Sequence, residues 1–317
     1  MFKILVKKPL GEGVTLYEVE APRVARRHRP GQFVMLRPHA HSERIPLTIA
    51  DVDRQKGTIT LVVQAVGKTT IEMNEAFDEG DAFANVAGPL GNPTHIAIPG
   101  KPTDFKGTVV CVAGGIGAAP MLPIARAFRD AGHEVLTILG ARRSDLLVFQ
   151  DRLGAVSSEV LLCTDDGSRG RKGFVTDVLK DLIESRHAQG GDVHLAVAIG
   201  PPLMMKFCSK ATEPYGVPTL VSLNTIMVDG TGMCGGCRVM VDGVAKYVCV
   251  DGPEFDGHHV DFDGMMRRQA MYKPEEAASL ERYRENDPAC QLQASVAAAV
   301  SEAETETAER PDARTRA

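Results

Sequence analysis

Three cysteines and one aspartate in the C-terminal part of the chain have the spacing of metal ligands. Two residues separate Cys234 from Cys237, Cys249 follows in the next short segment, and Asp229 precedes Cys234 by four intervening residues. Plant-type two-iron ferredoxins hold their cluster with a Cys-x4-Cys-x2-Cys pattern and a distant fourth cysteine. Asp229 occupies the first position of that pattern. We interpret the segment as a [2Fe-2S] site with three thiolate ligands and one carboxylate ligand.

The residues around these ligands favour a tight loop followed by a hairpin. Asp242-Gly243 lies between two short runs, RVMV and VAKYV, and predicts a two-residue turn that brings Cys249 back beside Cys237. Glycine tolerates positive φ, which lets backbone N–H groups turn toward anionic sulfur. Four glycines do this here: Gly230, Gly232, Gly235 and Gly236.

Other interpretations fit the same residues. The cysteines are also compatible with buried thiols, or with a zinc site in which a carboxylate fills the fourth position. An aspartate before glycine is a common turn residue, so water or a residue elsewhere could be the fourth ligand instead of Asp229.

A second set of residues suits a nucleotide. A glycine-rich turn follows the apolar run TVVCVAG and opens a predicted helix over residues 118–131. Such a turn lets a pyrophosphate approach the backbone, and the helix N-terminus stabilises its charge. The next strand ends at Arg142 and Arg143, which could hold a 2′-phosphate or face water. The residues of the turn are Gly114, Gly115, Gly117 and Pro120, and Gly200 and Pro201 follow a later strand.

Two regions with different hydrophobic patterns must position these residues. Residues 2–92 carry short alternating runs with one helical stretch, which predicts a small antiparallel barrel. From residue 108, strands alternate with helices, which predicts a parallel sheet whose last strand lies near residue 220. The predicted domains are residues 1–95, 106–221 and 222–275, with a charged helix and disordered tail over 276–317.

Composition limits the function classes. The chain has 317 residues, 44% of them hydrophobic and 24% charged, as expected for a soluble globular protein. A net charge of −5 gives no reason to expect nucleic acid or an anionic membrane as a partner, and no apolar run is long enough for a membrane span. Seven cysteines, three of them in metal spacing, favour a reducing, cytoplasmic location over a disulfide framework.

The barrel segment resembles the ferredoxin reductase superfamily. Its Pro-Gly-Gln-Phe stretch at residues 30–33, its Arg-Ile-Pro-Leu-Thr stretch at 44–48 and the GGxGxxP turn carry this resemblance. The resemblance implies an FAD in the barrel and a nicotinamide nucleotide at the glycine turn, with Arg142, Gly200 and Pro201 beside it. Arg44 would meet the pyrophosphate and Thr48 the isoalloxazine. The other implied FAD contacts are Ile45, Pro46, Leu47, Val62, Val63, Gln64, Gly67, Thr69 and Thr70. The Gly67-Lys68-Thr69 stretch is not a P-loop, because the P-loop pattern requires glycine at position 62, which is Val62 here.

Four longer sequence stretches narrow the resemblance to particular groups within that superfamily. SLNTIMVDGTGMCGGC, CVDGPEFDGH, RIPLTIAD and TDDGSRGRKGFVTDVL resemble the small subunits of NADH-dependent reduced ferredoxin:NADP oxidoreductases, and the architecture also resembles the electron-transfer subunit of bacterial dihydroorotate dehydrogenase. The first resemblance implies NAD(H), with NADP(H) as the alternative. It also implies a larger flavoprotein partner with [4Fe-4S] clusters, which links the chain to ferredoxin indirectly.

The resemblance implies one order of electron transfer among the three cofactors. Nicotinamide transfers a hydride, an iron–sulfur cluster takes single electrons, and a flavin does both, so the flavin must lie between them. Hydride transfer requires no acid or base from the protein, so we predict no catalytic side chain. Dihydroorotate oxidation, a zinc-stabilised adaptor and a freestanding flavin reductase stay open as alternatives.

Overall fold

The structure is a computed structural model that describes residues 1–285. The chain forms two compact units, residues 1–270 and residues 271–317. The described part of the second unit is the helix α9 (Lys273–Glu285), and the predicted disordered tail lies outside the described residues. No helix among residues 1–285 is both long and apolar enough to cross a bilayer.

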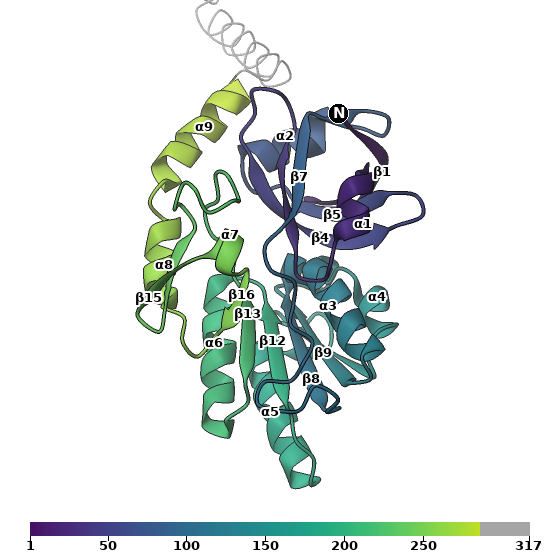
Figure 1. The fold of residues 1–317 in the computed structure, drawn as a ribbon, viewed down its shortest axis with the longest axis vertical. Coiled ribbons are helices and arrows are strands. Elements are labelled where there is room, and N and C mark those ends of the chain that lie inside the picture. The colour runs from purple at the N-terminus through teal and green to yellow at the C-terminus, as the bar shows by residue number, and fades with distance from the viewer. Residues whose placement is uncertain (286–317) are drawn as a thin grey trace, which may run out of the picture. The chain divides into compact units, whose positions relative to one another are not determined.

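The first sheet confirms the predicted antiparallel architecture as an incomplete barrel (Figure 1). Its strand order is β6-β1-β2-β5-β4-β3-β7, and no ladder joins the end strands β6 and β7. Tyr17, Ile49 and Phe83 are fully buried in its core. The strands are β1 (Phe2–Gly11), β2 (Val14–Glu20), β3 (Phe33–Arg37), β4 (Ile45–Asp53), β5 (Thr58–Gln64), β6 (Ala82–Phe83) and β7 (Asn85–Leu90), with helices α1 (Pro22–Arg27) and α2 (Lys68–Ala76) between them.

The second sheet has the order β11-β10-β9-β8-β12-β13-β16 and is parallel except for β16. Every residue of β8 and β12 is buried, which explains their unbroken apolar runs. The strands are β8 (Thr108–Gly114), β9 (Glu134–Ala141), β10 (Glu159–Thr164), β11 (Arg171–Lys172), β12 (Leu195–Ile199), β13 (Thr219–Ser222) and β16 (Glu254–Asp256). The connecting helices are α3 (Ala118–Asp130), α4 (Gln150–Gly154), α5 (Val175–Ala188) and α6 (Pro202–Thr212), with short 3-10 turns at Gly115–Gly117, Ser144–Leu146 and Glu213–Tyr215.

The prediction that β13 is the last strand of this sheet was wrong. The chain leaves β13, passes through residues 223–253, which contain the four predicted ligands, and returns as β16, which pairs antiparallel with β13. Ser222 lies opposite Glu254 in this ladder. β16 has three residues, which is too short for an alternating pattern to be visible in the sequence.

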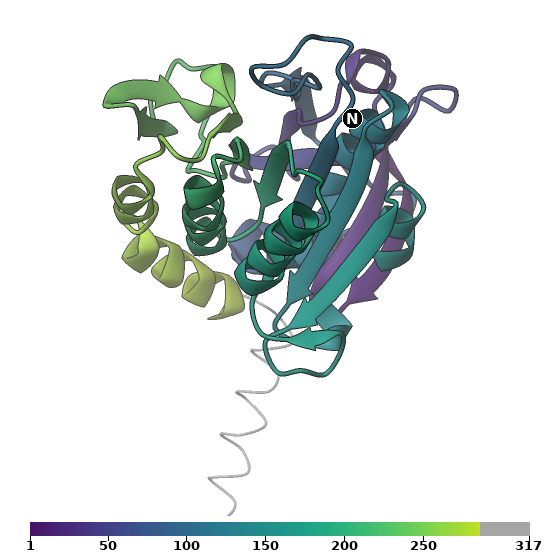
Figure 2. The same ribbon diagram turned by 90° about the horizontal axis from the view of Figure 1, so that it is seen from below.

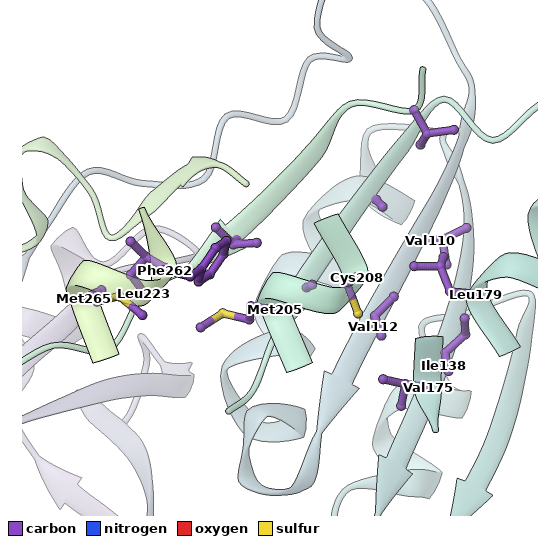
Figure 3. Close-up of a cluster of buried hydrophobic side chains, with 14 of the residues drawn as sticks. Val110, Val112, Ile138, Val175, Leu179, Met205, Cys208, Leu223, Phe262 and Met265 are labelled. Carbon is purple, nitrogen blue, oxygen red and sulfur yellow. The ribbon is translucent and has the colours of Figure 1, made fainter. Parts of the chain in front are cut away.

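Alternate residues of β8 face two separate cores. Cys111 belongs to the core under α3 and α4, whereas Val110 and Val112 belong to the core under α5 and α6. That second core continues through Leu223, Phe262 and Met265 into the predicted metal-binding segment, residues 222–275, as Figure 3 shows. The segment also contains the hairpin β14 (Arg238–Val241) and β15 (Val244–Tyr247) and the helices α7 (Val248–Asp251) and α8 (Phe262–Gln269), which lie on the α6 side of the sheet (Figure 2).

Candidate redox site

The hairpin brings two of the predicted ligands together. Asp242 and Gly243 both have positive φ, 51° and 70°, as a type I′ turn requires. The amide of Val248 donates to the carbonyl of Cys237 at 3.2 Å, which closes the end of the hairpin. The sulfurs of Cys237 and Cys249 lie 3.2 Å apart, and both side chains are buried. The structure therefore places these two thiols as one pair.

The other two predicted ligands form a second pair. The Asp229 carboxylate accepts the amides of Thr231 at 2.9 Å and of Cys234 at 2.8 Å. These backbone hydrogen bonds, that from Thr231 first, lower the pKa of Asp229. Cys234 is exposed, and its sulfur accepts the amide of Gly236 at 3.4 Å. Across residues 1–285, no three His, Cys, Asp or Glu side chains converge as in a preformed metal site. The sulfurs of Cys237 and Cys249 are paired, and Asp229 meets Cys234 through its backbone amide.

Polar atoms around this loop suit an anionic cluster. Arg268 of α8 donates from Nη2 to the carbonyl of Gly236 at 3.3 Å, while its Nε is buried without a hydrogen-bond partner. The hydroxyl of Thr225, in the segment before Asp229, is also buried and unpartnered. Buried donors without acceptors are costly. A thiolate-bound cluster would place negative charge in the loop that the Arg268 guanidinium contacts at Gly236, so the residues fit such a group.

The state of the thiols is consistent with this fit. Burial, followed by the contact with Cys237, raises the pKa of Cys249 to about 12, so the metal-free thiol is neutral. A coordinating metal deprotonates its thiol ligands outright. Binding of a cluster would therefore release protons from this loop.

The metal loop packs directly on the barrel. A Cβ placed on Gly230 would lie 2.5 Å from Cγ of Met35 in β3 and 3.0 Å from Cδ1 of Leu90 in β7. Met35 in turn lies opposite Pro46 of β4 in the antiparallel ladder. Adjacent strands are about 4.8 Å apart. One strand, β3, therefore separates the metal loop from the segment predicted to hold the flavin.

The predicted flavin residues flank an opening between two strands. The ladder between β4 and β5 begins at Ile49 and Leu61, so residues 45–48 pair with β3 alone and residues 62–64 with β2 alone. Unpaired backbone groups on the two facing edges are free to bind a ligand. Val62 and Val63 are buried and can contribute only through their backbone and apolar surface, whereas Arg44 is exposed just before β4.

The two threonines predicted to contact the FAD, Thr69 and Thr70, have protein partners. The hydroxyl of Thr70 accepts the amides of Val66 and Gly67 at 3.0 Å and donates to the carbonyl of Gly67 at 2.9 Å, and so it caps α2. Thr69 donates to Glu43 at 3.1 Å. No atom lies within 4 Å of a Cβ placed on Gly67, so the backbone of this turn is open to a ligand.

The glycines of the nucleotide turn have distinct roles. A Cβ on Gly117 would lie 2.2 Å from the carbonyl oxygen of Ile199, and Cβ atoms on Gly114 and Gly200 would meet the sulfur of Met204 at 2.4 and 2.8 Å. These three glycines allow the turn after β8 to pack on the turn after β12. Gly115 has φ +55° and no atom within 4 Å of its Cβ position.

The structure thus brings the two predicted nucleotide segments together. Gly115 presents open backbone at the N-terminus of α3, which is the feature that binds pyrophosphate. Pro120 lies in the first turn of that helix, where its missing N–H has no partner to lose, and Pro201 precedes the first residue of α6.

The arginines after β9 are not equivalent. Arg143 forms ion pairs with Asp145 at 2.8 Å and Glu12 at 3.0 Å, which raise the pKa of its guanidinium. Arg142 is exposed, and its carbonyl accepts the amide of Asp166 at 3.3 Å. Asp166 accepts hydrogen bonds from Ser168, which lower the pKa of its carboxyl. This edge of the sheet therefore carries a neutralised Arg143 and an ionised carboxylate.

Three residues that the sequence interpretation missed join the barrel to the metal-binding segment. The side chain of Asn92 donates to the carbonyls of Val250 and Asp251, both at 3.0 Å. The hydroxyl of Thr94 donates to the carboxylate of Glu254 at 2.6 Å. A carboxyl in the short Pro-Glu-Phe strand, soon after the last predicted ligand, is the signal that could have identified this junction.

Cavity size does not locate the site. A cavity of about 730 Å³ lies between the β4–β5 end of the barrel and helices α3 and α4, and none of the residues predicted to hold flavin, nucleotide or metal lines it. It contains an ion pair between the two domains, in which Arg126 of α3 binds both carboxylate oxygens of Asp51 at 2.8 and 3.2 Å. This pair ties the helix after the nucleotide turn to the strand that carries the predicted flavin residues.

Comparison with known proteins agrees with this architecture. Residues 224–261 match the iron–sulfur cluster binding domain of dihydroorotate dehydrogenase B, and residues 111–210 match the oxidoreductase NAD-binding domain. A dihydroorotate dehydrogenase B electron transfer subunit homologue from Thermotoga maritima is 46% identical over 89% of this chain and 95% of its own length. The electron transfer subunit from Desulforamulus reducens is 32% identical over 81% and 96%.

Solved structures also resemble this chain in sequence and fold. A chain of an NADH-dependent reduced ferredoxin-NADP oxidoreductase, studied for flavin-based electron bifurcation, is 44% identical, covers 89% of this chain and 98% of its own length, and has a TM-score of 0.81. A ferredoxin NADP+ reductase from Neisseria gonorrhoeae, solved with FAD and NADP, shares the fold with a TM-score of 0.53 at 18% identity, over 68% of this chain and 90% of its own. The chain therefore belongs to the family of dihydroorotate dehydrogenase B electron-transfer subunits and their homologues, with a ferredoxin reductase-like fold, an NAD-binding oxidoreductase domain and an iron–sulfur domain.

Proposed function

We propose that this chain transfers electrons between NAD(H), a bound FAD and a [2Fe-2S] cluster, and passes them to or from a larger partner flavoprotein. The observation that carries the proposal is the contact of Gly230 with Met35, because Met35 pairs with Pro46 of the predicted flavin strand. This contact brings the predicted metal loop onto β3, the strand that pairs with the one predicted to hold the flavin. A chain that only bound a structural metal would not require that approach.

Each predicted residue set has a defined task in this proposal. Residues 1–95 hold the FAD between β4 and β5, residues 106–221 bind the nucleotide at the turn after β8, and residues 222–275 hold the cluster. Asp229, Cys234, Cys237 and Cys249 are the proposed ligands. Bound FAD would accept a hydride and release single electrons. The chain binds, orients and shields these groups, and no side chain need act as acid or base in the hydride step.

The charges after β9 and β10 support NAD(H) as the nucleotide. A 2′-phosphate needs a free cation, but Arg143 is already neutralised by Asp145 and Glu12. The Asp166 carboxylate held at the end of β10 would repel a phosphate and suits a ribose hydroxyl. If the nucleotide is NADP(H), Arg142 is the arginine that would bind its 2′-phosphate.

The surface of the metal loop supports a protein partner. Met233 is 85% exposed and Val228 is 59% exposed on either side of Asp229, and Cys234 is itself exposed. Exposed apolar side chains around a redox centre suit a docking surface. We propose that the partner is a larger flavoprotein with [4Fe-4S] clusters, which would connect this chain to ferredoxin. The alternative partner is a dihydroorotate-oxidising subunit, because relatives at 32% identity carry that name.

The decisive experiment measures iron, acid-labile sulfide and flavin in protein purified without oxygen, followed by an EPR spectrum after reduction with NADH. We expect FAD and a two-iron signal. Zinc in place of iron, or a colourless protein, would refute the proposal in favour of an adaptor. Reconstitution with the co-purifying subunit, assayed with dihydroorotate and with NADPH plus ferredoxin, separates the two partner classes.

A further inference from the structure

Glu254 is a carboxyl without a charged partner at the junction of three chain segments. Its side chain is partly buried in β16, and the hydroxyl of Thr94, from the linker after the barrel, donates to it at 2.6 Å. A Cβ on Gly31 would lie 2.4 Å from the Thr94 hydroxyl and 3.0 Å from Glu254 Oε1, so the turn before β3 presses on the same pair. In the described part of the chain, no lysine, arginine or histidine forms an ion pair with this carboxyl.

The position of Glu254 relates it to both proposed redox centres. On one side, Gln32 follows Gly31, and its carbonyl accepts the amide of Ile49 next to the predicted flavin residue Thr48. On the other side, Gly252 leads back to the predicted ligand Cys249, and its carbonyl accepts the amide of Asn92 at 2.7 Å. Glu254 therefore belongs to a set of contacts that connects the strand predicted to hold the flavin with the segment that carries the predicted ligands.

The electrostatic surroundings favour a carboxyl that binds a proton reversibly. Burial raises the pKa of Glu254 to about 7, and the hydrogen bond from Thr94 opposes this rise. The titratable group that faces it from β8 is Cys111, whose thiol pKa is raised to about 12 by burial and by Glu254, so it stays neutral. Asp256, on the same strand, is exposed. The partial exposure of Glu254 lets protons exchange with water.

We propose that Glu254 takes up a proton from water when an electron arrives at the neighbouring redox centres, and releases it when the electron leaves. This inference rests on the proposed function. The balance is one electron from the nicotinamide-linked donor on the centre and one H⁺ from solvent on a carboxylate oxygen of Glu254, which forms one O–H bond. The added negative charge is thereby offset inside the chain. Thr94 acts as a positioning residue, because its hydroxyl donates to one carboxylate oxygen and binds the charged form more strongly than the protonated form.

The test uses the cofactor-loaded protein and a midpoint potential as its readout. An EPR-monitored redox titration of the cluster is repeated from acidic to alkaline pH for the natural chain, for Glu254→Gln and for the matched control Asp256→Asn. Complete coupling changes the reduced-to-oxidised ratio tenfold per pH unit, which corresponds to about 59 mV for one electron. We expect a pH-dependent segment near neutrality in the natural chain and in Asp256→Asn, and its loss in Glu254→Gln.

A second variant and a spectroscopic signature keep the inference testable if Glu254→Gln binds its cofactors poorly. Thr94→Val removes the donor to the carboxylate and should move the pH-dependent segment to higher pH. Infrared difference spectra on reduction should show the C=O band of a protonated carboxyl, which Glu254→Gln lacks. The same pH profile in all variants would overturn the inference while leaving the electron-transfer proposal intact. Absence of flavin or iron from the natural chain would overturn both.

Discussion

Gly230 provides a direct test of the contact between the metal loop and the barrel. It has φ +73°, and its Cβ position lies 2.5 Å from Met35 Cγ. In Gly230→Ala, left-handed backbone in a residue with a side chain costs about 1–2 kcal/mol. Forcing a methyl group against Met35 and Leu90 costs roughly another 1–3 kcal/mol. The expected total is about 2–5 kcal/mol.

The chain offers a matched control for the backbone part of this cost. Gly243, in the hairpin turn of the same segment, has φ +70° but no atom within 4 Å of its Cβ position. Gly243→Ala should therefore cost only the backbone strain of about 1–2 kcal/mol. The difference between the two variants, about 1–3 kcal/mol, isolates the close approach to β3. For a unit of this size it corresponds to a difference in Tm of about 2–5 °C.

The assay combines scanning calorimetry of the loaded protein with stopped-flow reduction by NADH. We expect both variants to keep the rate of flavin reduction, because the nucleotide turn and β4 are unchanged. Gly230→Ala should slow the subsequent reduction of the cluster, since its methyl group pushes the loop away from Met35, whereas Gly243→Ala should not. Equal Tm shifts and equal cluster reduction rates in the two variants would refute the geometry on which the proposed function rests.

Four further predictions follow from the site. Asp229→Cys should retain a cluster with a changed EPR spectrum, and an unchanged spectrum would count against Asp229 as a ligand. Arg143→Ala should leave the ratio of NADH to NADPH turnover within about twofold, because its charge is already neutralised; a tenfold loss of NADPH turnover, about 1.4 kcal/mol, would assign it to a 2′-phosphate. Arg126→Gln should slow flavin reduction with little change in flavin content, and should cost at most about 1 kcal/mol of stability, because its ion pair with Asp51 is partly exposed; an unchanged rate would show that the pair does not orient the two domains. The raised pKa of Glu254 means that its charge destabilises the fold progressively as pH rises from about 4.5 to 7. Glu254→Gln should therefore match the natural chain in Tm near pH 4.5 and exceed it at pH 8 by the equivalent of about 3 kcal/mol, and equal Tm values at pH 8 would contradict the burial argument.

The sequence predicts those parts of the fold that local patterns determine. The apolar runs at β8 and β12 report a strand buried on both faces, and Asp242-Gly243 reports the hairpin because few residue pairs accept two positive φ angles. The spacing of Cys237 and Cys249 then follows from that turn, and their sulfurs meet as expected. Each of these features could be predicted because residues close together in the sequence determine it.

Features that depend on long-range pairing were not visible in the sequence. β16 has only three residues, and its place beside β13 depends on where the metal-binding segment ends. Thr70 is predicted to contact the FAD, and the sequence did not reveal that the α2 turn also engages its hydroxyl with three backbone groups. Arg143 has the residue type of a phosphate ligand, yet Glu12, far away in sequence, neutralises it. Partners from distant segments decide the role of each residue.

The return of the chain as β16 explains how the proposed electron route would be held in place. The metal-binding segment leaves the sheet after Ser222 and re-enters it at Glu254, and these two residues lie opposite each other in one ladder. Both ends of residues 223–253 are therefore held in neighbouring strands of the second sheet. From that base the segment reaches the barrel through Gly230 on Met35 and through Asn92 on the carbonyls before Gly252. Three anchors on two sheets leave the metal loop little freedom to change its distance from β4. A change in the β13–β16 ladder should consequently alter electron transfer even though no ladder residue is a proposed cofactor ligand.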